Sequence, residues 1–196
     1  MTTTKEFDDG IMETKDITQN IIQFGYSTIT GYFNITDAMV EEALGIMDDF
    51  SYKGGKLKRT VPSKISSELS NIVFNSDLKN TFDPICKNIQ CQEVFLTHDY
   101  IADKMERNMW LHFDRLRSLK VMVYLSDVSE DSGAFSVVPE SHKVGHFLRT
   151  GFKNVEGYEN KKNRIKLDYP HLYEEPIKIC GPKGTVIFFD SDIFHL

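Results

Sequence analysis

The stretch Trp110-Leu111-His112-Phe113-Asp114 decides how this sequence is interpreted. It is followed by 118–125 (SLKVMVYL), a run typical of a buried strand. Side chains alternate faces along an extended chain, so His112 and Asp114 point the same way and can hold one metal ion from one side. A third ligand must come from elsewhere, and the segment 185–195 (TVIFFDSDIFH) offers His195. Two histidines and one carboxylate leave coordination positions open, which suits non-haem Fe(II) and its chemistry with O2.

The composition is that of an ordinary soluble globular protein. Its 196 residues are enough for one domain with a single core, and 40% of them are apolar and 27% charged. A net charge of -6 predicts no nucleic-acid-binding face. No apolar run approaches the roughly 20 residues of a membrane span, and the N-terminus lacks an apolar signal core. The three cysteines have no metal-binding spacing, which favours a cytoplasmic protein with reduced thiols. The sequence leaves the oligomeric state open.

The sequence divides into an arm, a helical part and a part with strand patterns. Residues 1–20 are polar, which predicts a loose N-terminal arm ahead of a single domain over 21–196. Apolar residues recur at helical spacing in the flank 34–90 and alternate in strand-like fashion from residue 92 to residue 196. The segment 140–176 is long and irregular, which is typical of a lid or binding loop. Helices followed by antiparallel-type strands predict an α+β fold, with the strands rolled into a barrel or sandwich.

Local signals define the expected elements within these parts. Apolar spacing after an N-cap marks the helices, and alternation rich in β-branched and aromatic residues marks the strands. The expected helices cover 36–50 with Thr36 as N-cap, a segment beginning at Pro62, and a segment capped by Ser76 that Pro84 kinks or ends; the expected strands lie within 24–33, 93–101, 110–114, 118–125, 134–138, 177–180 and 185–190; and 51–60 is expected to be a loop.

An ordered set of motifs extends the pair of His112 and Asp114. It comprises the segment 133–143 (GAFSVVPESHK) and the ending 181–195 (GPKGTVIFFDSDIFH). This set resembles the phytanoyl-CoA dioxygenase family of Fe(II)- and 2-oxoglutarate-dependent oxygenases, in which Gly often stands at the position of Glu140. The resemblance implies a double-stranded β-helix, a cupin-like jelly roll, flanked by N-terminal helices. It also implies His112, Asp114 and His195 as the metal ligands.

The resemblance implies a dioxygenase that hydroxylates a small organic molecule, with Fe(II) as cofactor and 2-oxoglutarate and O2 as co-substrates. A ferrous ion held by two imidazoles and one carboxylate keeps three positions free, of which the oxo acid can chelate two and O2 can take the last. The oxidant that forms as the oxo acid loses CO2 can remove hydrogen from an unactivated C–H bond, which acid–base chemistry of side chains cannot do. Desaturation or ring formation at the same metal is the alternative reaction.

One feature of the family is expected to be missing. The resemblance implies an Arg about ten residues beyond the distal histidine, on the last barrel strand, paired with the far carboxylate of 2-oxoglutarate. This sequence ends at Leu196, so either the chain is truncated or another cation takes that role. Lys120 is the internal candidate, because it alternates with the apolar face of 118–125, and Tyr124 on the same face is a second candidate for cofactor binding. A solvated strand face is the other interpretation of Lys120. The departure also leaves open a non-catalytic jelly-roll binding module.

The remaining histidines, arginines and aromatic residues are weaker candidates. His98 neighbours Asp99, but adjacent residues of a strand face opposite sides and cannot hold one metal ion. His142 is expected to make structural hydrogen bonds. Other candidates are His146 and His171 for substrate contact in the long loop, Trp110, Phe113, Tyr124, Phe135 and Phe188 for the cavity wall or the plain core, and Arg115 and Arg117 for an anionic substrate group or, more commonly, solvated turn charges.

Overall fold

A computed structural model describes residues 14–47, 55–60, 65, 67–85, 94–99, 111–114, 116–151 and 176–196. The elements in chain order are α1 (Thr14–Phe24), β1 (Tyr26–Ile29), α2 (Asp37–Met47), β2 (Gly55–Thr60), α3 (Ser67–Val73), α4 (Ser76–Phe82), β3 (Val94–Asp99), β4 (Leu119–Val123), β5 (Ser136–Val138), α5 (His142–Gly151), β6 (Ile177–Lys178), β7 (Val186–Asp190) and β8 (Phe194–His195). The predicted α+β class is confirmed. Trp110, Arg115, His171 and the expected loop beyond Gly151 up to residue 175 lie outside the described residues.

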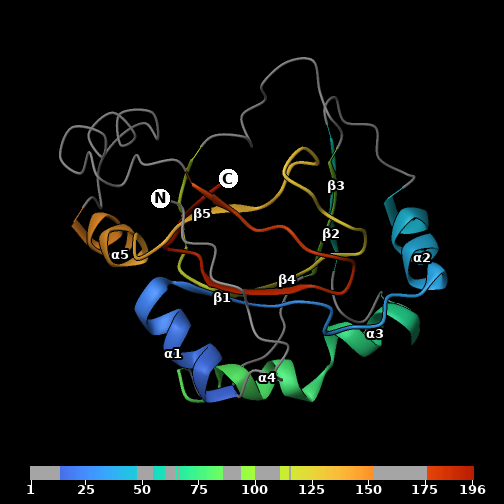
Figure 1. The fold of residues 1–196 in the computed structure, drawn as a ribbon, viewed down its shortest axis with the longest axis horizontal. Coiled ribbons are helices and arrows are strands. Elements are labelled where there is room, and N and C mark those ends of the chain that lie inside the picture. Colours follow the sequence, from blue (N-terminus) through green and yellow to red (C-terminus); the bar gives the residue numbers. More distant parts are fainter. Residues whose placement is uncertain are drawn as a thin grey trace, which may run out of the picture.

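The described strands form three small antiparallel sheets, with orders β1-β7-β4, β2-β3 and β6-β5-β8. The first and third sheets enclose a core cluster to which β7 contributes Ile187 and Phe189 and β5 contributes Val137. Helices α1 and α4 cover the opposite face of the first sheet, where Phe82 packs edge-on against Phe188 (Figure 1). Phe189 of β7 belongs to this core cluster, and its ring centre lies 5.5 Å from that of His195 on β8, so His195 lies at the edge of the space between the two sheets.

The alternation predicted for 118–125 is confirmed. Leu119 and Val123 pack against the cluster under α1 and α4, whereas Met122 and Tyr124 pack between the sheets. Lys120 lies opposite Phe189 in the register of β4 and β7, so its side chain begins on the inner face of the sheet. This placement is what makes Lys120 relevant to the site.

Helix α1 includes residues 14–20, which are the described end of the expected N-terminal arm 1–20. Its residues Ile17 and Ile21 are 3% and 2% exposed and pack against Val186 and Phe188 of β7. The hydroxyl of Thr18 also donates a hydrogen bond to the carbonyl of Thr81, at 3.1 Å. An apolar stripe this short gives little signal in a polar sequence, and the helix is stabilised by tertiary packing.

The expected helical flank 34–90 contains a strand, β2, as well as helices. Helix α2 has the expected cap, because the Thr36 hydroxyl accepts a hydrogen bond from the amide of Met39 at 3.3 Å. Helix α4 is capped by Asn75 instead of Ser76, since the Asn75 side chain accepts from the amides of Asp77 and Leu78. The expected loop 51–60 contains strand β2, which pairs with β3 along its whole length. Pairing with a distant strand overrides the polar character of this sequence.

Helix α5 occupies the first part of the expected loop 140–176. Val144 and Leu148 face Phe113 and Phe194, so the helix covers the outer face of β5 and β8. Gly145 and Gly151 weaken the helical pattern in the sequence, because glycine is a poor helix former. No helix in the described part of the chain is long and apolar enough to cross a membrane.

The turn from β5 into α5 contains a strained residue. Glu140 has a φ of 66°, a left-handed conformation that costs a residue with a Cβ about 1–2 kcal/mol. Its amide donates to the carbonyl of Phe24 at 2.8 Å, which ties the turn to the end of α1. Glycine would adopt this conformation without strain.

We therefore expect Glu140→Gly to raise the free energy of unfolding by about 0.5 kcal/mol, because the relieved strain exceeds the extra entropy of glycine in the unfolded chain. Urea unfolding followed by circular dichroism measures the change. Glu140→Ala is the matched control, since it also removes the ion pair with Lys143 but keeps the Cβ. Equal stabilities of the two variants would contradict the strain argument.

Candidate metal centre

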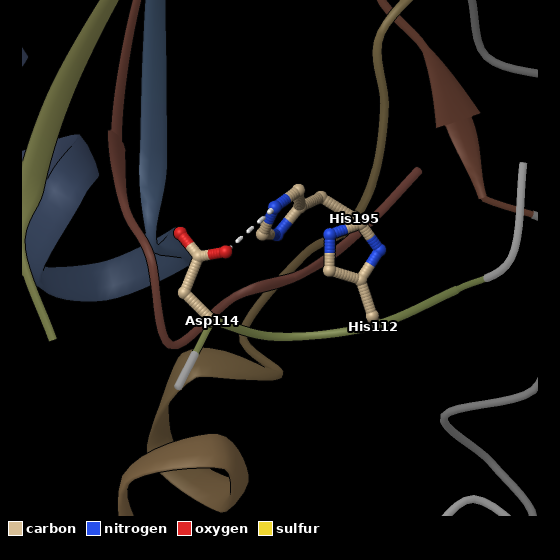
Figure 2. A group of neighbouring side chains, drawn as sticks. All are labelled: His112, Asp114 and His195. Atoms are coloured by element: carbon tan, nitrogen blue, oxygen red, sulfur yellow. Dashed lines mark ion pairs between the residues drawn. The ribbon is translucent and has the colours of Figure 1, made fainter. Parts of the chain in front are cut away.

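Backbone pairing brings together two segments that lie far apart in the sequence. The amide of His112 donates to the carbonyl of His195 at 2.9 Å, and the amide of His195 donates back to the carbonyl of His112 at 2.7 Å. The amide of Asp114 also donates to the carbonyl of Ser191. One nitrogen of each histidine and one carboxylate oxygen of Asp114 all lie within 4.8 Å of one another (Figure 2). The three residues implied by the motifs are therefore neighbours in space.

The ring of His195 is held in one orientation. Its Nδ1 lies 2.7 Å from the carbonyl oxygen of Ile193, so Nδ1–H donates and Nε2 keeps its lone pair. That Nε2 lies 4.0 Å from Oδ1 of Asp114, along the dashed line of Figure 2. Burial, and then the neighbouring charge of His112, lower the pKa of His195 to about 4. His195 is thus a neutral imidazole at neutral pH, the form that binds a metal.

These donors fit a divalent transition metal. Such ions bind imidazole nitrogen and carboxylate oxygen at about 2.0–2.2 Å, as zinc does, and separations below 5 Å allow three ligands to reach one ion. His195 is buried, whereas the side chain of Asp114 is 25% exposed, so one side of the group stays accessible. The centres of the two histidine rings lie 4.4 Å apart, so the two imidazoles lie next to each other within the group. Two imidazoles and one carboxylate on one side of an ion form the set typical of non-haem iron.

Lys120 reaches the same group. Its Nζ pairs with Oδ2 of Asp114 and lies 5.8 Å from the centre of the Phe189 ring. The Lys120 side chain is 39% exposed, so the ammonium is partly withdrawn from water at the mouth of the site. Its position does not match a fully solvated strand face.

A second group of charges fixes the turn between β7 and β8. Arg117 donates to the buried carboxylate of Asp190 through Nη2 at 2.7 Å and through Nε at 3.1 Å. Its Nε also lies 3.5 Å from Oδ2 of the fully buried Asp192, as does Nδ1 of His146. Arg117 is therefore a structural cation. The sequence held a signal for it, since buried acids on a strand need a cationic partner, but it could not identify which cation.

A comparison with known protein families identifies the family to which this chain belongs. The profile of the phytanoyl-CoA dioxygenase (PhyH) family matches residues 47–196. The chain belongs to the phytanoyl-CoA dioxygenase family. It is therefore an Fe(II)- and 2-oxoglutarate-dependent oxygenase that acts on a small molecule, with O2 as the second co-substrate. A search of curated protein sequences finds no match.

Solved structures share the fold of this phytanoyl-CoA dioxygenase family member. SnoK, an α-ketoglutarate-dependent carbocyclase from nogalamycin biosynthesis, has a TM-score of 0.64 at 16% identity, covering 92% of this chain and 76% of SnoK. SnoN, an epimerase from the same biosynthesis, has a TM-score of 0.61 at 13% identity, with coverages of 93% and 75%. HygX from Streptomyces hygroscopicus, with nickel and 2-oxoglutarate bound, has a TM-score of 0.55 at 14% identity, with coverages of 94% and 80%. At these identities the likeness shows the fold.

Tyr124 of this dioxygenase family member is buried beside the site. Its hydroxyl donates to the carbonyl of Ile179 at 2.8 Å and accepts from the amide of Phe135 at 3.3 Å. Burial is the main reason that its pKa is raised to about 12. The hydroxyl therefore already has two backbone partners. Its cofactor-binding role stays a prediction.

The aromatic residues near the metal group differ from those expected. Phe135 is confirmed as a neighbour, with its ring centre 5.5 Å from that of His195. Phe188 faces the helices, and Phe113 stacks on Phe194 beneath α5. Phe189, which the sequence analysis did not select, lies 5.5 Å from the His195 ring. All five residues of β7 are buried, so its sequence shows no polar alternation that could assign the faces.

His142 has the structural role that the sequence predicts. Its Nε2 lies 3.1 Å from the carbonyl oxygen of Ile22 at the end of α1, and burial lowers its pKa. His146 lies on α5 next to Asp192, outside the metal group.

The close approach of α5 to the turn that precedes His195 leads to a prediction. A Cβ at Gly145 would overlap the backbone carbonyl of Asp192, whereas a Cβ at the exposed Gly45 of α2 would meet nothing within 4 Å. Gly145→Ala should lower the free energy of unfolding by about 2–3 kcal/mol, and Gly45→Ala should raise it by up to about 1 kcal/mol. Thermal and urea unfolding measure both. Similar stabilities of the two variants would contradict this packing of α5.

Proposed function

We propose that His112, Asp114 and His195 hold the ferrous ion of this oxygenase, and that the enzyme hydroxylates a small organic molecule. The main support is the mutual approach of their three donor atoms within 4.8 Å in a chain of this family. The pairing of His112 with His195 fixes both imidazoles, and the hydrogen bond from Asp114 to Ser191 fixes the third ligand.

The overall reaction consumes substrate R–H, 2-oxoglutarate and O2, and it yields R–OH, succinate and CO2. When bound, the ferrous ion supplies the activation of O2 that side chains cannot provide. The residues of this chain supply the rest. Ile193 keeps the lone pair of His195 directed at the site, Asp114 adds a compensating negative charge, and the rings of Phe135 and Phe189 exclude water on one side.

We assign Lys120 as the cation that binds the distal carboxylate of 2-oxoglutarate, and Tyr124 as part of the wall beside it. Lys120 lies on the inner face of β4 and reaches Asp114, so its ammonium is close enough to the metal ligands to meet a bound oxo acid. The ammonium pairs with Asp114 in this structure, and a carboxylate of the co-substrate bound beside it would be a second anionic partner.

The three small sheets are, we propose, parts of one double-stranded β-helix. The sheets β1-β7-β4 and β6-β5-β8 enclose a shared apolar cluster, and α1, α4 and α5 cover their outer faces. The likeness to SnoK supports this reading. The ligands then lie at the mouth of the roll, on the short paired segments at residues 112 and 195.

The test of the proposed function is turnover of 2-oxoglutarate in the absence of substrate. We expect slow, Fe(II)-dependent formation of succinate, measured by NMR, because the co-substrate can be oxidised without a C–H partner. His112→Ala and Asp114→Ala should each reduce this rate at least about 100-fold, because a ligand is lost. His146→Ala is the matched control and should stay within about twofold.

Two results would contradict the assignment. Full turnover by Asp114→Ala would remove the carboxylate from the ligand set. Absence of turnover in the unaltered protein, with metal bound, would favour a binding module. Once a substrate is identified, the product mass separates hydroxylation (an added oxygen atom) from desaturation or ring formation (loss of two hydrogens).

Lys120→Ala should weaken 2-oxoglutarate binding at saturating Mn(II) at least about tenfold, or about 1.4 kcal/mol, because a charge-assisted contact is lost. Isothermal titration calorimetry measures this affinity. Lys143→Ala is the surface control, since Lys143 pairs with Glu140 at the start of α5. Unchanged affinity in Lys120→Ala would mean that another group binds the distal carboxylate.

A further inference from the structure

The two oxygens of the Asp114 carboxylate have different partners. Oδ1 lies 4.0 Å from Nε2 of His195, on the side of the proposed metal ligands. Oδ2 pairs with the ammonium of Lys120. The carboxylate therefore lies between a position suited to a divalent cation and the ammonium of Lys120.

On its face of the sheet, Lys120 has no second carboxylate among the described ion pairs. Its ammonium approaches the ring of Phe189, and the next inward residue of β4 is Met122. Two buried acids of the β7–β8 turn, Asp190 and Asp192, pair with Arg117 at 2.7 Å and 3.5 Å. Among the described residues, Asp114 is the carboxylate that pairs with Lys120.

A metal ion at His112, Asp114 and His195 would draw on the same carboxylate as Lys120. Two like charges that share one partly buried carboxylate repel each other, and partial exposure of both side chains weakens this repulsion without removing it. An anion that binds next to the metal would reverse the effect, because it supplies Lys120 with a second partner. Lys120 thus opposes the metal when it is alone and favours the metal together with the oxo acid.

We propose that Lys120 couples the two binding steps: it competes with the metal for Asp114 and transfers its ion pair to the carboxylate of the oxo acid. This inference rests on the proposed function, and it adds a property that a simple carboxylate anchor lacks. An anchor contributes only to oxo acid affinity. A competing cation also lowers the affinity for metal alone, and by linkage each ligand then strengthens binding of the other.

The experiment measures Mn(II) affinity by the electron paramagnetic resonance signal of free Mn(II), which requires no turnover. Without 2-oxoglutarate, Lys120→Met should bind Mn(II) about fivefold more tightly than the unaltered protein, because a competing charge is removed. Lys120→Arg keeps the charge and should match the unaltered protein within about twofold. Lys120→Gln is a second neutral variant that replaces the Met variant if that one is poorly folded by circular dichroism.

Saturating 2-oxoglutarate should reverse the order of the affinities. It should tighten Mn(II) binding by the unaltered protein at least about tenfold more than it does for Lys120→Met. Unchanged or weaker Mn(II) binding by both neutral variants, without 2-oxoglutarate, would overturn the proposed competition. Equal tightening by 2-oxoglutarate in all variants would overturn the proposed transfer.

Failure of the proposed function gives a different pattern. His112→Ala should lose Mn(II) binding whether or not Lys120 is altered. If His112→Ala binds Mn(II) normally, or if the unaltered protein does not bind it, the ligand assignment is wrong and the role of Lys120 fails with it. If His112→Ala loses binding and the neutral Lys120 variants behave as the unaltered protein, the metal site stands and only the coupling is wrong.

Discussion

Two reciprocal backbone hydrogen bonds between His112 and His195 determine the geometry of the site. They join the segment around His112 to strand β8 at the end of the sequence. Both imidazoles therefore lie on the same side of the paired backbones. Because strand side chains alternate, a shift by one residue would turn an imidazole to the opposite face. The arrangement of the donors is thus a property of backbone pairing, and the side chains need only small rotations to meet one ion.

The parts of the site that depend on local alternation were predictable from the sequence. His112 and Asp114 share a face because they are two residues apart, and Lys120 faces inward because its neighbours in β4 face outward. The cap of α2 by Thr36 is equally local. These inferences use the geometry of a few bonded residues, which the sequence specifies directly.

The features that were missed depend on distant partners. Strand β2 forms because β3 supplies its hydrogen bonds, and α1 forms because two isoleucines find a buried surface on β7. The exchange of Phe188 and Phe189 has the same cause: all five residues of β7 are buried, so the sequence does not show which of the two rings faces the site. The use of Arg117 as a partner of Asp190 likewise requires knowledge of which segments meet.

The boundary of the family match has a consequence for how this protein is handled in fragments. The match begins at residue 47, whereas β1 pairs with β7 and α1 covers Phe188 of the same strand. A fragment trimmed to the matched region would leave β7 as an unprotected edge strand with an apolar face in water, which is a template for self-association. The folded domain therefore includes α1 and β1, which precede the region that the family profile matches.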